Sequence, residues 1–203
     1  DEWKPLSGLT FNLGLRYDVQ TGVWNENHSQ SEYPRPLPYV DFAKRGDKNN
    51  FAPRTGFAWD VKKNGRSVMR GGYGLVYVNI TNATMGNEIT ALKQSSITIN
   101  NPSYPDPYGG RDPASFISTA PPNVSILNND LRNSPVHTYT LGYSQQLVAD
   151  TAINIDGAYQ TSNHYLTSEN INTPRNGVRP LPEWGQINSM PRALSRRRNG
   201  SLS

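Results

Sequence analysis

The sequence predicts an all-β fold, an antiparallel up-and-down transmembrane β-barrel segment of about five to six strands from a larger barrel, with long extracellular loops. Three observations predict it. Apolar and polar residues alternate in five stretches of about nine to eleven residues, long enough to cross a bilayer at a tilt. Short and long connections alternate between these stretches, and aromatic residues gather at the long-loop end.

The composition fits an aromatic, turn-rich β protein. The chain has 203 residues, of which 34% are hydrophobic, 17 are Gly and 16 are Pro. It has no cysteine, which excludes a disulfide scaffold and structural thiolate zinc. The net charge is +4, and much of the excess comes from Arg192 and Arg196 to Arg198, so no nucleic-acid partner is expected.

The first two strands are expected at residues 9–18 and 50–60. In the first, every second residue is apolar: Leu9, Phe11, Leu13, Leu15 and Tyr17. In the second, Phe51, Phe57 and Trp59 share one face, and Pro53 must lie near the start of the strand or at an edge because it cannot donate a ladder hydrogen bond.

The third strand is expected at residues 67–78, after a tight turn at Asn64-Gly65. A three-residue loop of residues 63–65, with Gly65 in the left-handed conformation, keeps the two faces matched. It pairs Trp59 with Met69, Phe57 with Gly71 and Phe51 with Tyr77. The ring of Phe57 can then cover Gly71, and Asp60 and Arg70 become diagonal neighbours.

The last two strands are expected at residues 137–147 and 152–161, joined by a tight turn around Ala149-Asp150. Residues 19–49, 79–135 and 162–185 are long connections with little periodicity and no helical pattern. Residues 1–190 are therefore interpreted as a partial barrel. Residues 191–203 are interpreted as a basic tail, disordered or produced by truncation.

Several stretches resemble TonB-dependent outer-membrane receptors of the Oar-like type. "NFAPRTGFAWDVKKNGRSVMRGGYGLVY" is similar to a hairpin of that family, "LTFNLGLRYD" to its preceding strand, and "LRNSPVHTYTLGYSQQL" with "INIDGAYQTSNHYL" to a later pair. The resemblance spans most of residues 6–187. It implies a bacterial outer-membrane barrel, usually of 22 strands, that is filled by a plug, driven by the TonB complex and used to take up a nutrient such as an oligosaccharide, peptide or siderophore.

Two groups of candidate site residues follow. Polar residues on the strands are candidates for lining the lumen or contacting the plug: Asn12, Arg16, Arg54, Asp60, Arg70, Asn154 and Asp156. Aromatic residues in the long loops are candidates for ligand capture: Trp24, Tyr33, Tyr39, Tyr104 and Tyr108. The alternative fold is a soluble extracellular β-sandwich, a carbohydrate-binding or adhesive module, in which Leu13, Phe57, Tyr73, Leu141 and Ile155 would be buried between two sheets.

No chemistry beyond binding is indicated. The histidines, His28, His137 and His164, lack the spacing of metal ligands, so no metal and no cofactor are predicted. No nucleophile, base or pair of carboxylates can be assigned to one site, so the chain is not expected to be an enzyme. The expected partners are outer-membrane lipid, the plug, the TonB complex and an unidentified solute.

Overall fold

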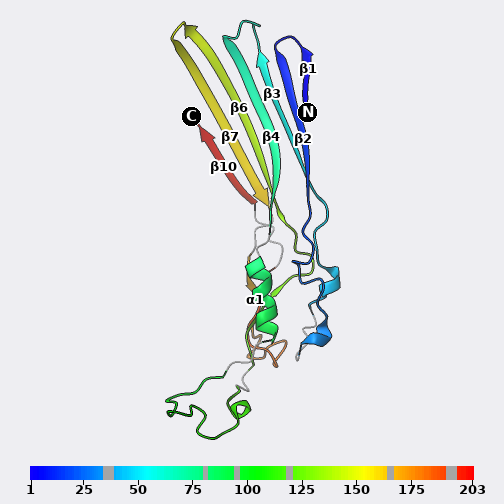
Figure 1. Ribbon diagram of the computed structural model, residues 1–203, viewed down its shortest axis with the longest axis vertical. Coiled ribbons are helices and arrows are strands. Elements are labelled where there is room, and N and C mark those ends of the chain that lie inside the picture. Colours follow the sequence, from blue (N-terminus) through cyan, green and yellow to red (C-terminus); the bar gives the residue numbers. More distant parts are fainter. Residues whose placement is uncertain (34–38, 80–81, 94–96, 118–120, 164–166, 191–195) are drawn as a thin grey trace.

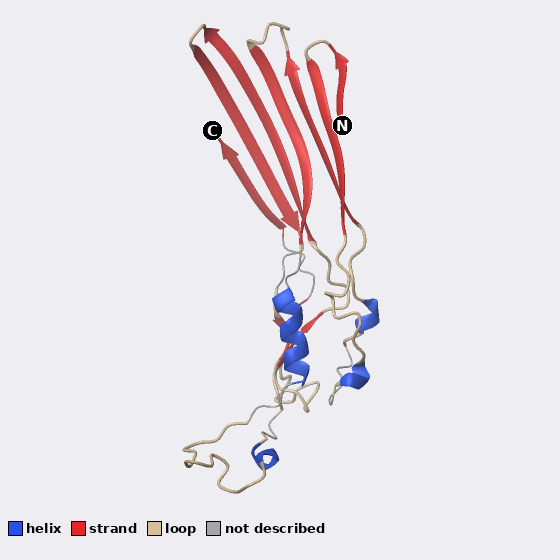
Figure 2. Cartoon of the chain, viewed as in Figure 1, coloured by secondary structure: helices blue, strands red, loops and turns tan. Residues whose placement is uncertain are grey.

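A computed structural model describes residues 1–33, 39–79, 82–93, 97–117, 121–163, 167–190 and 196–203. Its main feature is a seven-stranded antiparallel sheet in the order β1-β2-β3-β4-β6-β7-β10 (Figures 1 and 2). The strands are β1 (Glu2–Leu6), β2 (Leu9–Asp18), β3 (Asn50–Asp60), β4 (Ser67–Val78), β6 (Ser134–Val148), β7 (Thr151–Asn163) and β10 (Arg196–Leu202). The strands of this sheet pair in their order along the chain. β4 pairs with β6, and β7 with β10, because the strands that lie between them in sequence belong to a separate sheet.

The pairing keeps the alternation in phase from strand to strand. Leu9 lies opposite Trp59, and Trp59 lies opposite Met69. Met69 in turn lies opposite Tyr143, which lies opposite Ile155. One face of the sheet is therefore apolar and the other polar, because side chains alternate between the faces of a strand. The expected all-β, antiparallel fold class is confirmed, and β2, β3 and β4 have the bounds expected from the sequence.

The β3–β4 hairpin has the expected register. Trp59 pairs with Met69 and Phe57 with Gly71, while the recorded pairs end at Arg54 and Gly74, so Phe51 and Tyr77 lie beyond them. Gly65 is left-handed, with φ of 71°, but Lys63 is too, at 54°. The ladder continues past the ends of the strands, because the Val61 amide donates to the Ser67 carbonyl at 3.0 Å, and the register leaves residues 63–65 as the expected loop.

Two edge strands extend the sheet beyond the five strands placed from the sequence. β1 pairs with β2, and its Trp3 ring stacks on Phe11 with the ring centroids 5.8 Å apart. β10 pairs with β7 from Arg196 opposite Asn163 to Leu202 opposite Gly157. The expectation of disorder is corrected for residues 196–202, which form a strand, whereas residues 191–195 lie outside the described residues.

The long connections fold into a second region, which we call the loop cap. It consists of the described parts of residues 19–49, 79–133 and 167–190, and it lies at the end of the sheet opposite the tight turns (Figure 1). Its elements are η1 (Gln30–Glu32), η2 (Phe42–Lys44), α1 (Asn82–Lys93), η3 (Pro113–Phe116), β5 (Val124–Leu127), β8 (Glu169–Asn170) and β9 (Ile187–Met190). The last two strands and β5 form a small mixed sheet, with β5 and β9 parallel. The expectation that these loops contain no helix was wrong.

Almost all of the buried apolar residues belong to the loop cap. One cluster comprises Tyr33, Val40, Phe42, Leu92, Val124, Ile126, Trp184 and Ile187. A second comprises Trp24, Met85, Leu127 and Leu131. No helix in the described ranges is both long and apolar enough to cross a membrane.

Candidate functional site

The polar face of the sheet carries the strand candidates. The register places Asn12 opposite Gly56, Arg54 opposite Gly74, and Arg70 opposite Gly142, which in turn lies opposite Asp156. Asn154, Arg16 and Asp60 share this face by the same alternation. Every strand candidate therefore lies on one face, and small residues lie beside the long charged ones.

The centre of this face holds an ion pair that spans three strands. Arg70 Nη2 lies 2.8 Å from both carboxylate oxygens of Asp156, and Nε lies 3.2 Å from Oδ1. Arg70 also donates to Ser144 Oγ at 2.9 Å. The pair passes over Gly142, where an added Cβ would lie 2.2 Å from Asp156 Oδ1. A side chain at position 142 would therefore require Arg70 and Asp156 to shift.

The predicted interaction of Asp60 with Arg70 does not form. Asp60 Oδ2 instead accepts a hydrogen bond from the Gly65 amide at 2.7 Å, which helps to close the turn. Arg70 is drawn away because Asp156 offers two oxygens in the bidentate geometry that a guanidinium prefers. The sequence pattern could not reveal this partner, since Asp156 is 86 residues away.

A hollow of about 480 Å³ lies beside Arg54, lined also by Asn12, Gly14 and Gly56. No ion pair of Arg54 is seen among the described residues, whereas Arg16 Nε lies 2.7 Å from Asp18 Oδ1. At Gly74, an added Cβ would meet no atom within 4 Å. The polar face thus combines a free guanidinium with open space, which suits contact with a second body.

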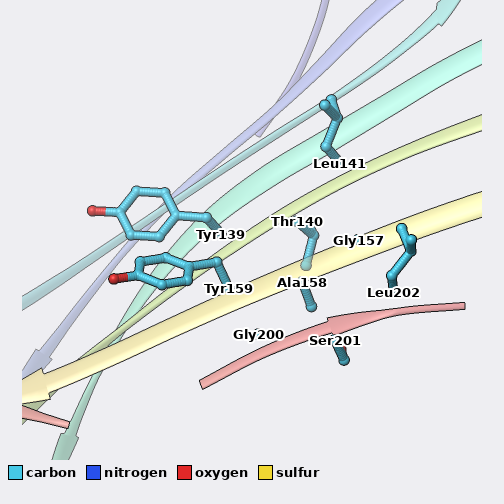
Figure 3. A pocket seen from close by; sticks show the side chains of 9 residues that line it. All are labelled: Tyr139, Thr140, Leu141, Gly157, Ala158, Tyr159, Gly200, Ser201 and Leu202. Atoms are coloured by element: carbon cyan, nitrogen blue, oxygen red, sulfur yellow. The ribbon is translucent and has the colours of Figure 1, made fainter. Parts of the chain in front are cut away.

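Much of the apolar face is exposed, although Leu75, on the same face, is buried. Leu141 is 54% and Ile155 is 52% exposed, and no second sheet covers them among the described residues. Tyr139, Leu141, Tyr159 and Leu202 surround an open groove of about 580 Å³ above Gly157 and Gly200 (Figure 3). Such a face contradicts the β-sandwich alternative, in which these side chains would be buried.

The loop aromatics divide into two groups. Trp24 and Tyr33 are buried in the clusters of the loop cap, so their expected role in ligand capture is corrected: they hold the loops together. Tyr39 is exposed, and Tyr104 is 97% exposed. Tyr108 is half-buried, with its ring centroid 5.9 Å from that of Phe116. Tyr39 and Tyr104 are therefore the accessible candidates.

Tyr104 and Tyr108 lie in a loop of residues 97–117 at the end of the molecule farthest from the strands (Figure 1). A bridge between Ile97 and Ile117 closes this loop. Inside it, the amides of Gly110 and Tyr108 donate to the Asp106 carboxylate and hold its pKa below the usual range. The loop thus has a defined shape, although no large core supports it.

A buried ion pair in the loop cap was missed by sequence reasoning. Arg45 Nη1 and Nη2 lie 2.6 Å and 2.8 Å from the two Glu88 oxygens, and both side chains are 1% exposed. Glu88 also accepts from the Leu127 amide at 2.9 Å and from Asn25 Nδ2 at 2.8 Å. Arg45 Nη2 donates to the Leu127 carbonyl at 2.6 Å. One carboxylate thus joins the first loop, α1 and β5.

The sequence signal that could have indicated this buried ion pair is the spacing of apolar residues around Glu88. Met85, Ile89 and Leu92 recur at helical intervals, and Glu88 lies between them on the same face. A charged residue within an apolar stripe is normally scored as breaking the helical pattern. Here it was instead the sign of a buried partner.

The histidines form no metal centre among the described residues, where no group of three or more acidic, histidine or cysteine side chains is arranged to hold an ion. His28 Nδ1 lies 3.0 Å from Glu32 Oε2, and His137 Nδ1 lies 2.9 Å from the Tyr73 hydroxyl. His164 lies outside the described residues.

Comparison with known proteins agrees with this geometry. No curated protein matches the chain. A family model described as an outer membrane beta barrel domain matches residues 1–200. That match covers nearly the whole chain and places the protein in the bacterial outer membrane. The chain therefore belongs to the family of outer membrane beta barrel domains.

Proposed function

We propose that this chain forms part of the barrel wall of a TonB-dependent outer-membrane receptor of the Oar-like type, which takes up a nutrient such as an oligosaccharide, a peptide or a siderophore. The family match supports the barrel. The hairpin motifs, from Asn50 to Tyr77, support the finer assignment. We propose no catalytic activity, no cofactor and no nucleic-acid partner.

The observation that carries the proposal is the folded loop cap at one end of the strands. Connections of this length are costly to order unless their own packing offsets the lost entropy. Here two apolar clusters and the Arg45–Glu88 pair supply that packing. A packed cap with Tyr39 and Tyr104 exposed on it is suited to hold a solute before it passes through the barrel.

The polar face has a complementary role in this proposal. Arg54, beside its hollow, and the open space at Gly74 would contact the plug. The Arg70–Asp156 pair neutralises itself and would stiffen the wall. In this proposal the barrel stays fixed, and the plug moves when the TonB complex delivers energy.

The proposal is tested by uptake in cells that express the full-length protein. Labelled oligosaccharides, peptides and siderophores are supplied with and without a protonophore, and in cells that lack the TonB complex. We expect uptake of one class to stop in both conditions, while binding at the cell surface persists. Uptake that continues without the proton gradient would identify a passive pore and overturn the proposal.

A residue-level test uses the exposed aromatics. Tyr104→Ala and Tyr39→Ala remove accessible rings and should weaken solute binding by about tenfold each if stacking holds a sugar or peptide. Tyr108→Ala is the matched control in the same loop, because its ring already packs on Phe116. Equal binding by all three variants would place capture elsewhere.

A further inference from the structure

The first long loop carries two buried charges two residues apart, Arg45 and Asp47. Arg45 forms a bidentate ion pair with Glu88. Asp47 is only 2% exposed, yet it has no ion pair among the described residues, and its Oδ1 has no hydrogen-bond partner. A buried carboxylate without a counter-ion is strongly unfavourable, so something positive is expected beside it.

The surroundings of Asp47 are rich in unpartnered oxygen atoms. The backbone amide of Asn133 donates to Asp47 Oδ2 at 2.8 Å, and the side-chain Nδ2 of Asn50 lies 3.4 Å from the Asp47 carbonyl oxygen. These contacts place Asn50 and Asn133 directly against Asp47. Both asparagines are at most 2% exposed, and the side-chain Oδ1 of each has no partner. Three buried oxygens, two from residues 47–50 and one from Asn133, therefore lack a donor.

We propose that Asp47, Asn50 and Asn133 form a binding site for a hard cation, with Ca²⁺ the best match, at the junction of the sheet and the loop cap. Carboxylate and amide oxygens are the ligands that Ca²⁺ prefers, and it takes about six to eight of them, so backbone carbonyls and water would complete the shell. A single carboxylate implies weak affinity, of the order of 10⁻⁴–10⁻³ M, as in extracellular modules.

The position of the site indicates a structural role for the bound cation. Asn50 is the first residue of β3, and Asn133 directly precedes β6. A cation between them would tie the first loop to the base of two strands. A competing charge in the same region is Arg132, but its guanidinium donates to the carbonyls of Gly46 and Leu131 and makes no ion pair with Asp47 among the described residues.

Tb³⁺, which replaces Ca²⁺, is the probe for this site in the full-length protein purified in detergent. The Tyr17 hydroxyl donates to the Lys48 carbonyl at 2.7 Å, so a tyrosine able to excite bound Tb³⁺ lies beside Asp47. We expect saturable Tb³⁺ emission that Ca²⁺ displaces. Asp47→Asn should weaken this binding by tenfold or more and Asn50→Ala by less. Asp130→Asn, an exposed acid of the same region, should have no effect.

A second measurement covers the case in which Asp47→Asn fails to fold. In the unmodified protein, millimolar Ca²⁺ should slow hydrogen exchange of the Asn133 amide severalfold, and a chelator should reverse the effect. Emission that is the same in Asp47→Asn, or Asn133 exchange that is indifferent to Ca²⁺, would overturn the proposal. Either result would mean that water or Arg132 satisfies Asp47.

Discussion

The sheet and the loop cap differ in the exposure of their apolar side chains. In the sheet, Leu141 and Ile155 point outward and remain about half exposed. In the loop cap, Leu127 and Ile187 are buried almost completely. The difference follows from two solvents: lipid covers the outer face of a membrane barrel, so the sheet needs no core on that side, whereas the cap lies in water and must bury its own.

The two regions differ in their charges as well. Arg70 and Asp156 form a bidentate pair with side chains 46% and 45% exposed, while Arg45 and Glu88 form one that is 1% exposed on both sides. The geometry is similar, but the cost of losing one partner is not. An exposed charge is solvated when its partner is removed, and a buried one is not.

The largest expected effect is in the cap. Glu88→Ala leaves Arg45 buried without a partner, which should cost about 3–5 kcal/mol. Hydrogen exchange should show the Leu127 amide and the surrounding cap opening while the strands stay protected. The Arg45→Met/Glu88→Leu double variant should recover most of the loss. Strands that open together with the cap would contradict the separation of the two regions.

The next effect is on the lipid face. Leu141→Arg should destabilise the barrel by about 2–4 kcal/mol in a bilayer, because it places a charge in hydrocarbon. The matched control is Thr138→Arg, on the polar face opposite Gly74. Denaturant unfolding in lipid vesicles measures both variants of the full-length protein. A larger loss for Thr138→Arg would show that the two faces have been assigned the wrong way round.

A smaller effect is expected at Gly142. Gly142→Ala requires the paired side chains of Arg70 and Asp156 to shift, since the added Cβ would lie 2.9 Å from Arg70 Nε as well. Because the pair is nearly half exposed, the loss should not exceed about 1 kcal/mol. Gly74→Ala has open space and should be neutral. Denaturant unfolding in lipid vesicles measures the stability of the two variants. Equal stability would mean that the Arg70–Asp156 pair contributes nothing.

The smallest effect is a pH dependence of the distal loop. The folded pKa of Asp106 lies below its usual value because amides of Gly110 and Tyr108 bind the carboxylate. The resulting stabilisation is therefore complete above the usual carboxyl pKa and is lost as pH falls through the folded pKa. Exchange of the Gly110 amide should accelerate in that acid window. Asp106→Asn should remove the pH dependence, and an unchanged profile in that variant would contradict the assignment.

The sheet could be predicted from the sequence because the pattern that marks each strand lies within a short stretch of residues. Alternation of period two marks each strand, and the requirement that both faces agree selects the register, as in the pairing of Trp59 with Met69. The placement of the strand candidates on one face follows from the same rule. The β10 strand was missed because Arg196 to Arg198 hide the alternation in a run of like charges.

The loop cap could not be predicted because its contacts are distant in sequence. Arg45 and Glu88 are 43 residues apart, and Arg45 and Leu127 are 82 apart. Strand β5 has only four residues, too few for a periodic signal. The burial of Trp24 and Tyr33, which removed them from the ligand-capture candidates, depends on the same long-range packing.

The central claim is that the two faces of the sheet meet different solvents, and labelling consecutive residues tests it most directly. The chain has no cysteine, so cysteines introduced singly at Thr140 and Leu141 can each carry one fluorophore, with any cysteine elsewhere in the full-length protein replaced by serine, and the labelled proteins are placed in vesicles. We predict that nitroxide lipids quench the label at Leu141 but not at Thr140. Quenching at Thr140 alone, or equally at both, would contradict the account.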